Sequence, residues 1–140
     1  MIVFMGLAGS GKSTMGQLLA AKLNCPWIST GNLLRQKMDA KTQEQMLRGE
    51  IISDDHTLAV LDEEFRRIGN HGKQFILDGT PRTMRQAKWL VEKDQTGELK
   101  ITGIIHLNVS RETAKERLLA RQRPDDHERF AGWIARFLES

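Results

Sequence analysis

Cysteine and long apolar runs are scarce in this sequence. The single cysteine, Cys25, excludes an internal disulfide and any metal site built from several cysteines. We interpret it as a small packed residue rather than a reactive thiol. No apolar run approaches the roughly 20 residues that cross a bilayer, and the N-terminus lacks the charged start and cleavage site of a signal peptide. These absences predict a cytoplasmic protein without membrane contact.

A broad basic surface is also missing, although the net charge is +3. Residues 111–140 carry seven Lys and Arg side chains and six Asp and Glu side chains, so opposite charges are interleaved. This distribution argues against nucleic acid as a partner and favours small anionic molecules. The length of 140 residues allows one domain, residues 1–140, with a substantial core. We expect a monomer in preference to a dimer.

The segment of residues 6–14, GLAGSGKST, is the most specific feature that is present. It matches the phosphate-loop pattern G-x-x-x-x-G-K-[ST] and lies between an apolar run and an amphipathic stretch. Its glycines let backbone N–H groups converge on a phosphate, and the helix N-terminus adds a positive dipole end. Lys12 can reach the β- and γ-phosphates, and Ser13 can offer its hydroxyl to magnesium. The alternative is a glycine-rich turn that only joins strand to helix.

Strand and helix patterns alternate along the chain. Four apolar runs predict strands, at residues 2–5, 27–29, 75–77 and 101–109. The alternation predicts an α/β fold of the P-loop NTPase type, three-layer α/β/α with helices on both faces. We expect a parallel sheet of about four strands in the order 2-3-1-4.

The helices between these strands have recognisable ends and faces. Leu18, Leu19 and Leu23 predict the apolar stripe of the first helix. Asn32 is predicted to cap the helix that follows the second strand. Residues 38–53 are polar and carry a short helix near 42–47, so we place them outside the main sheet as a small lobe.

Phosphate-binding or acidic side chains follow every predicted strand. Ligands of open parallel sheets lie at the carboxyl ends of the strands. The residues at these ends, besides the phosphate loop, are Thr30, Gly31, Arg35, Asp78, Gly79, Arg82, Arg117 and Arg121. Asp78 is either a helix cap or a carboxylate that holds magnesium through water. Arg117 and Arg121 share one helix face, where they either bind an anion or form a solvated surface.

Five segments in order resemble the adenylate kinases, within the nucleoside monophosphate kinases. They are GLAGSGKST, STGNLLR, GEIISDD, FILDGTPRTMRQA and RLLARQRPDD, and they cover nearly the whole chain. The resemblance implies magnesium-dependent transfer of the γ-phosphoryl group of ATP to AMP. In such transfer the protein mainly aligns the substrates and neutralises phosphate charge.

The resemblance also implies roles for individual residues. It implies a catalytic role for Lys12, Arg82, Arg121, Arg123 and Arg136. It implies ATP binding by Gly9, Ser10, Gly11, Lys12, Ser13, Thr14, Arg117 and Arg121. It implies AMP binding by Thr30, Gly31, Arg35, Ile51, Gly79, Arg82 and Gln86, within which Gln86 reads the adenine. It implies that Ser13, and Asp78 through water, hold Mg2+ with ATP.

This chain departs from the family pattern at several positions. Asn32 stands where an aspartate is usual, and Thr80 stands where an aromatic residue is usual. The acceptor lobe, residues 31–55, is short, and the lid is reduced to about residues 121–124. Arg136 is either the last phosphate-binding arginine or a surface residue. Two alternatives therefore stay open: a kinase for another nucleotide or small acceptor, or a catalytically weak nucleotide-binding module.

Overall fold

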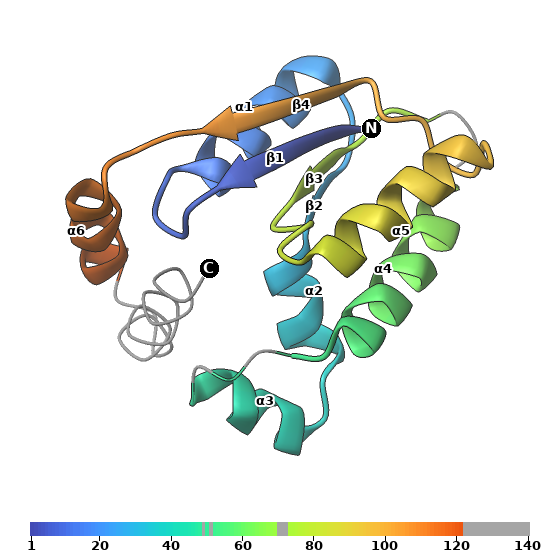
Figure 1. Ribbon diagram of the computed structural model, residues 1–140. Coiled ribbons are helices and arrows are strands. Elements are labelled where there is room, and N and C mark those ends of the chain that lie inside the picture. Colours follow the sequence, from blue (N-terminus) through green and yellow to red (C-terminus); the bar gives the residue numbers. More distant parts are fainter. Residues whose placement is uncertain (49, 51, 70–72, 122–140) are drawn as a thin grey trace.

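The computed structural model describes residues 1–48, 50, 52–69 and 73–121. In these ranges helices and strands alternate (Figure 1). The elements are β1 (Ile2–Gly6), α1 (Lys12–Leu23), β2 (Trp27–Ser29), α2 (Thr30–Lys37), α3 (Ala40–Leu47), α4 (Asp54–Ile68), β3 (Ile76–Asp78), α5 (Met84–Gln95), β4 (Gly103–Leu107) and α6 (Arg111–Arg121). Among the described helices, none has the length and apolar character needed to cross a membrane.

The strands form one parallel sheet in the order β2-β3-β1-β4, which confirms the predicted order. Its register aligns the carboxyl ends of three strands. Asp78, the last residue of β3, pairs with Ser29 of β2 on one side and with Phe4 of β1 on the other. The segments that follow these strands therefore leave the sheet at one edge, where parallel sheets bind ligands.

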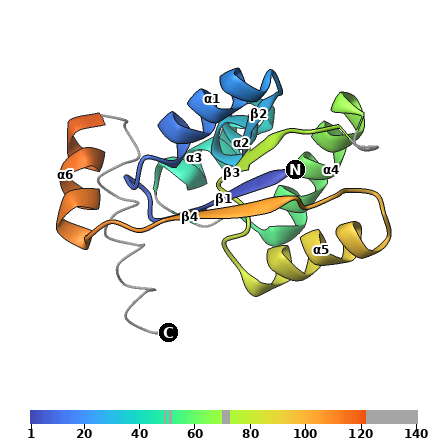
Figure 2. The same ribbon diagram turned by 90° about the horizontal axis from the view of Figure 1, so that it is seen from above.

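Helices cover both faces of the sheet (Figure 2), as the sequence predicts. Successive side chains of a strand point to opposite faces, so Val3 and Leu77 pack on the side of α4 and α5, whereas Phe4 and Ile76 pack on the side of α1. The first cluster also contains Met1, Ile28, Leu61, Phe65, Phe75, Leu90 and Leu99. The sheet is thus the middle layer of three.

The apolar stripe predicted for α1 was wrong. Leu18 and Leu23 are 61% and 45% exposed, and the buried positions of α1 are Gly16 and Ala20. A Cβ added at Gly16 would lie only 2.9 Å from the indole nitrogen of Trp27. The helix therefore approaches the sheet through small residues. Leu18 and Leu23 point outward, whereas Leu19 is partly buried against the cluster of Phe4, Ala20 and Ile76.

Short polar side chains begin several helices. The hydroxyl of Ser29 accepts a hydrogen bond from the backbone N–H of Asn32 at 3.4 Å, so Ser29 rather than Asn32 caps α2. The helix starts directly after β2, three residues earlier than predicted, because Ser29 still has extended backbone. Ser53 and Thr83 cap α4 and α5 in the same way.

The segment between α2 and α4 lies away from the sheet (Figure 1). Its helix α3 spans Ala40–Leu47, slightly longer than predicted. A separate small apolar cluster, formed by Leu34, Met38 and Val60, joins α2 to α4 beside this segment.

Candidate active site

The phosphate loop connects β1 to α1 and contains three glycines with positive φ. These are Gly6, Gly9 and Gly11, at φ of 138°, 82° and 95°. L-residues with side chains rarely adopt this backbone. Gly11 is the N-cap of α1, and no side chain caps the helix there. The first amide groups of α1 therefore have no side-chain acceptor and suit a bound phosphate.

Two of the loop glycines are also required by close packing. A Cβ at Gly6 would lie 2.4 Å from the carbonyl oxygen of Leu107, at the end of β4. A Cβ at Gly9 would lie 2.3 Å from the carbonyl oxygen of Ala114, in α6. The loop is therefore held between the end of β4 and the side of α6, which fixes its shape.

Lys12 points back over the loop. Its Nζ donates hydrogen bonds to the carbonyl oxygens of Gly6 and Leu7, at 2.8 and 2.6 Å. Burial lowers the pKa of Lys12 to about 8, the charge of Asp78 opposes this change, and the charges of Arg82 and Arg121 add to it. A bound triphosphate would place further negative charge beside Lys12 and so raise its pKa.

The hydroxyl of Ser13 meets the carboxylate of Asp78. Ser13 Oγ donates a 2.7 Å hydrogen bond to Asp78 Oδ2, and Asp78 is only 3% exposed. Two oxygen ligands from different elements thus lie together beside the phosphate loop. Magnesium prefers one or two protein oxygens together with phosphate and water, so this pair fits Mg2+. Thr14 follows in the first turn of α1 and is exposed.

The acceptor side begins where β2 and β3 end. The hydroxyls of Thr30 and Thr80, 3% and 1% exposed, share a 2.8 Å hydrogen bond. Thr80 thus makes a polar contact where an aromatic ring was expected from the family pattern. Gly79 has φ of 93°, and a Cβ there would lie 3.3 Å from Arg82 Nη2 and 3.6 Å from Thr30. Thr30, Gly79 and Thr80 therefore lie in contact with one another on the acceptor side.

Two arginines, Arg82 and Arg35, lie beside these acceptor-side residues. Arg82 Nε donates to the carbonyl oxygen of Gly79 at 2.8 Å. Although Arg82 is exposed as a residue, the protein atoms around its guanidinium lower its pKa, Asp78 opposes this, and Arg35 lowers it further. Arg35 also donates a hydrogen bond from Nη2 to Asn32 Oδ1. Asn32 therefore orients Arg35 through its side-chain carbonyl oxygen. An aspartate at this position would also offer an oxygen acceptor, so the asparagine keeps this contact.

Gln86 lies in the first turn of α5 and is 4% exposed. Its Oε1 accepts a 2.8 Å hydrogen bond from the backbone N–H of Arg82, and its Nε2 donates a 2.8 Å hydrogen bond to Asp54. Hydrogen bonds therefore hold this side chain both to Arg82 on the acceptor side and to Asp54 at the start of α4.

Arg117 and Arg121 approach the phosphate loop from α6. Arg117 Nη1 lies 3.5 Å from the carbonyl oxygen of Ser10. Arg121 is close enough for its charge to act on Lys12. The structure thus brings a lysine, four arginines and Asp78, which lie far apart in the sequence, to one edge of the sheet.

Known proteins share this pattern over most of the chain. Residues 4–139 match the family model for adenylate kinase. An adenylate kinase of Corynebacterium urealyticum is 36% identical over 133 residues, which cover 91% of this chain and 73% of the relative. Adenylate kinase 1 of Synechocystis sp. is 37% identical over 135 residues, with 91% and 71% covered.

The chain belongs to the adenylate kinase family. A third relative, the adenylate kinase of Mycobacterium leprae, is 34% identical over 131 residues, with coverage of 89% and 72%.

Some predicted site residues of this family member cannot be placed. Ile51, Arg123 and Arg136, and the predicted lid beyond Arg121, lie outside the described residues. The sequence reasoning missed one residue, Asp54, which contacts Gln86. An acid just after a capping serine was a signal that could have drawn attention to it, but such acids are common at helix starts.

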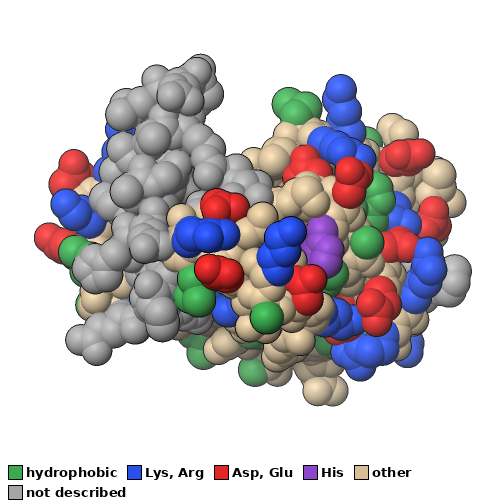
Figure 3. Space-filling model, turned by 90° about the horizontal axis from the view of Figure 1, so that it is seen from below, with side chains coloured by type: hydrophobic (Ala, Val, Ile, Leu, Met, Phe, Trp, Pro, Cys, Tyr) green, Lys and Arg blue, Asp and Glu red, His purple; other side chains and the backbone are tan. Residues whose placement is uncertain are grey.

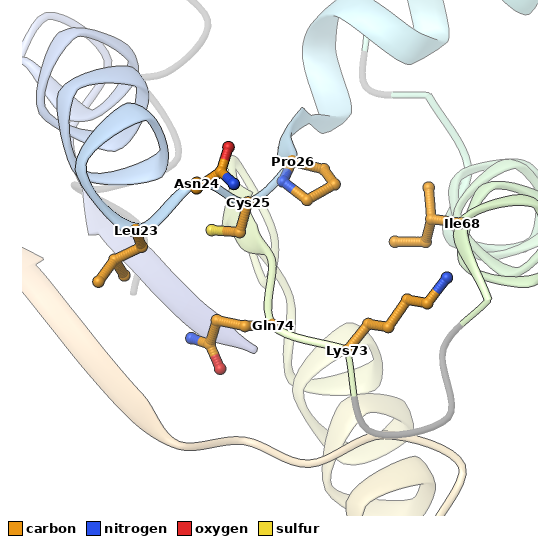
Figure 4. Close-up of a pocket in the computed structure, with 7 residues that line it drawn as sticks. All are labelled: Leu23, Asn24, Cys25, Pro26, Ile68, Lys73 and Gln74. Carbon is orange, nitrogen blue, oxygen red and sulfur yellow. The ribbon is translucent and has the colours of Figure 1, made fainter.

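A hollow lies at the other end of the sheet of this family member, away from the phosphate loop (Figure 4). It has a volume of about 270 Å³ and is lined by Leu23, Asn24, Cys25, Pro26, Ile68, Lys73 and Gln74. Cys25 and Gln74 come just before β2 and β3, so the hollow lies at the amino ends of strands. Burial raises the pKa of the Cys25 thiol, against the charge of the N-terminal amine, which disfavours the reactive thiolate. The phosphate loop and the residues around it lie at the opposite, carboxyl ends of the strands, where open parallel sheets bind ligands.

Proposed function

We propose that this chain transfers the γ-phosphoryl group of ATP to AMP and so forms two molecules of ADP. An oxygen of the AMP phosphate forms a bond to the γ-phosphorus, and the bond from that phosphorus to the oxygen bridging the β- and γ-phosphates breaks. The observation that carries the proposal is that the donor and acceptor sides meet at the end of β3: Asp78 accepts a 2.7 Å hydrogen bond from Ser13 of the donor side, and the next residue, Gly79, accepts a 2.8 Å hydrogen bond from Arg82 of the acceptor side. One site can therefore serve two phosphate groups.

The charged side chains supply most of the catalysis in this proposal. Lys12 holds the β- and γ-phosphates, while Arg82 and Arg121 neutralise the oxygens of the moving phosphoryl group. Arg123 and Arg136 are proposed to complete this set. The loop residues Gly9, Ser10, Gly11, Ser13 and Thr14 hold the phosphates of ATP, and Arg117 lies against its base.

Ser13, and Asp78 through water, would hold Mg2+ with ATP; their oxygens lie 2.7 Å apart beside the phosphate loop. When bound, the ion neutralises phosphate charge. The acceptor residues are Thr30, Gly31, Arg35, Ile51, Gly79, Arg82 and Gln86. We place them in one domain, residues 1–140, with residues 31–55 as the acceptor lobe and a lid at about residues 121–124.

The partners in this proposal are small molecules, and the chain acts as a cytoplasmic monomer. On the face shown in Figure 3, Lys and Arg side chains alternate with Asp and Glu side chains. Ion pairs of the described residues include Arg85 with Asp55 and Lys37 with Glu63. Interleaved charges of both signs support a preference for small anions over nucleic acid.

A coupled assay of ADP production from ATP and AMP tests the function. We expect turnover in the wild type, loss of turnover in Lys12→Ala, and wild-type turnover in Lys22→Ala. Lys22 is the matched control because it lies on the same helix but is exposed at the far end. ATP binding without ADP production would support a binding module instead. Faster turnover with CMP or UMP than with AMP would support another acceptor.

A further inference from the structure

A partly buried hydrogen-bond network joins the first turns of α4 and α5. Asp54, the first residue of α4, accepts a 2.8 Å hydrogen bond at Oδ1 from Gln86 Nε2 and a 2.7 Å hydrogen bond at Oδ2 from the Thr83 hydroxyl. The same Thr83 oxygen accepts from the backbone N–H of Gln86 at 3.2 Å. Asp54 therefore contacts both the cap of α5 and the amide that is proposed to read the base.

Two neighbours fix which end of the Gln86 amide is oxygen and which is nitrogen. The carboxylate of Asp54 can only accept hydrogen bonds, so it faces the NH2 group. The backbone N–H of Arg82 can only donate, so it faces Oε1 at 2.8 Å. Turning the amide over would place oxygen against the carboxylate and N–H against N–H. That arrangement loses two hydrogen bonds in a buried site.

One hydrogen-bond donor and one acceptor of the fixed Gln86 amide remain available for a ligand. A primary amide offers two N–H groups and two oxygen lone pairs, and the network uses one of each. A donor beside an acceptor complements an adenine edge, which has an amino group next to a ring nitrogen. A 6-oxo purine presents an oxygen in place of the amino group, so it would place oxygen against Oε1.

We propose that Asp54 is a positioning residue that fixes the Gln86 amide and thereby selects 6-amino over 6-oxo purine monophosphates as acceptors. This rests on the proposed function, in which Gln86 reads the acceptor base. Asp54 itself touches neither substrate; it acts through Gln86, with Thr83 holding its second oxygen.

The next residue provides a matched control. Asp55 also lies in the first turn of α4 and also pairs with α5, through Arg85. That pair is exposed, with side chains 76% and 61% accessible, and no contact from Asp55 to Gln86 is found in the described part of the chain. Loss of Asp55 therefore removes an acid and an interhelical link without changing the amide.

The test compares AMP with inosine monophosphate, which carries a 6-oxo group, as acceptors in the ADP-coupled assay. We expect Asp54→Ala to lower the ratio of kcat/KM for AMP to that for inosine monophosphate about tenfold, as for one buried hydrogen bond. The change should appear in KM for AMP, with KM for ATP unchanged. Asp55→Ala should keep the ratio within about twofold. The double variant of Asp54 and Gln86 should match Gln86→Ala alone.

Each outcome separates this proposal from the function on which it rests. If Gln86→Ala leaves the ratio unchanged, Gln86 does not read the base and both proposals fail at that residue. If Gln86→Ala lowers the ratio but Asp54→Ala does not, the positioning role is overturned and base reading stands. Equal losses with both acceptors, or a raised KM for ATP, would show a merely structural role.

Asp54→Leu covers the case in which Asp54→Ala does not fold. It keeps roughly the size of the side chain but offers no oxygen to Gln86, so it should also lower the ratio. A ratio equal to that of the wild type in folded Asp54→Leu would overturn the proposal.

Discussion

Raising the pH should weaken ATP binding through the loss of one proton from Lys12. Its pKa is lowered to about 8, mainly by burial, with Asp78 acting in the opposite direction. About three quarters of the molecules carry the charge at pH 7.5, and about a tenth carry it at pH 9. Since the charged lysine is the form that pairs with phosphate, the affinity for ATP should fall roughly eightfold over this range.

The lowered pKa of Lys12 also affects the stability of the protein without ATP. Raising the pH should weaken ATP binding but increase the free energy of unfolding. The folded pKa of about 8 lies below the ordinary value of 10.5 for Lys12. Between these values the unfolded chain binds the additional proton, so the free energy of unfolding should rise with pH. The full difference corresponds to about 3 kcal/mol. Below pH 8 the burial of the charged lysine costs the folded state this amount.

Isothermal titration with ATP at pH 7.5, 8.25 and 9 measures the effect. Repeating the titration at pH 9 in buffers of different ionisation enthalpy should reveal proton uptake on binding. Lys12→Ala should bind more weakly and lose the pH dependence, whereas Lys22→Ala should keep it. An affinity that stays constant from pH 7.5 to 9 in the wild type would refute the reasoning, as would an unchanged pH dependence in Lys12→Ala.

Four further substitutions test other parts of the structure. Gly9→Ala should weaken ATP binding more than about tenfold and cost at least about 2 kcal/mol, because its Cβ would lie 2.3 Å from a backbone oxygen of α6. Gly97→Ala, also at positive φ but with nothing within 4 Å, should cost about 1 kcal/mol and leave ATP affinity unchanged; equal losses of affinity would contradict this. Phe65→Ala should lower the free energy of unfolding by about 3–5 kcal/mol in urea, since Phe65 is fully buried; a loss below about 1 kcal/mol would contradict the packing. Asp78→Asn should lower the pH midpoint of ATP binding, because its carboxylate raises the pKa of Lys12; an unchanged midpoint would argue against that coupling.

Much of the fold could be predicted because its signals are local. The strand order and the helices on both faces are confirmed. Apolar runs, turn residues and the phosphate-loop pattern act over a few neighbouring positions, so the sequence displays them directly. The prediction of an apolar stripe on α1 was wrong at Leu18 and Leu23. The spacing of the leucines is typical of an amphipathic helix, but Gly16 and Ala20 let another face of the helix lie closer to the sheet.

The candidate site could be predicted in part. The loop residues and the residues at strand ends were found because parallel strands bring their carboxyl ends together. Their roles in binding stay predictions. Asp54 was missed because its partner, Gln86, is 32 positions away and the contact depends on how α4 packs against α5.

The sequence by itself determined the alternation of strands and helices, the phosphate loop and the family resemblance, since each depends on residue types at short, fixed spacing. The tertiary structure alone decided that the loop packs on α6, that Ser13 meets Asp78, and that the Gln86 amide lies between Asp54 and a backbone N–H. Such contacts depend on strand register and helix packing, which bring distant residues within hydrogen-bond distance and leave no trace in local spacing.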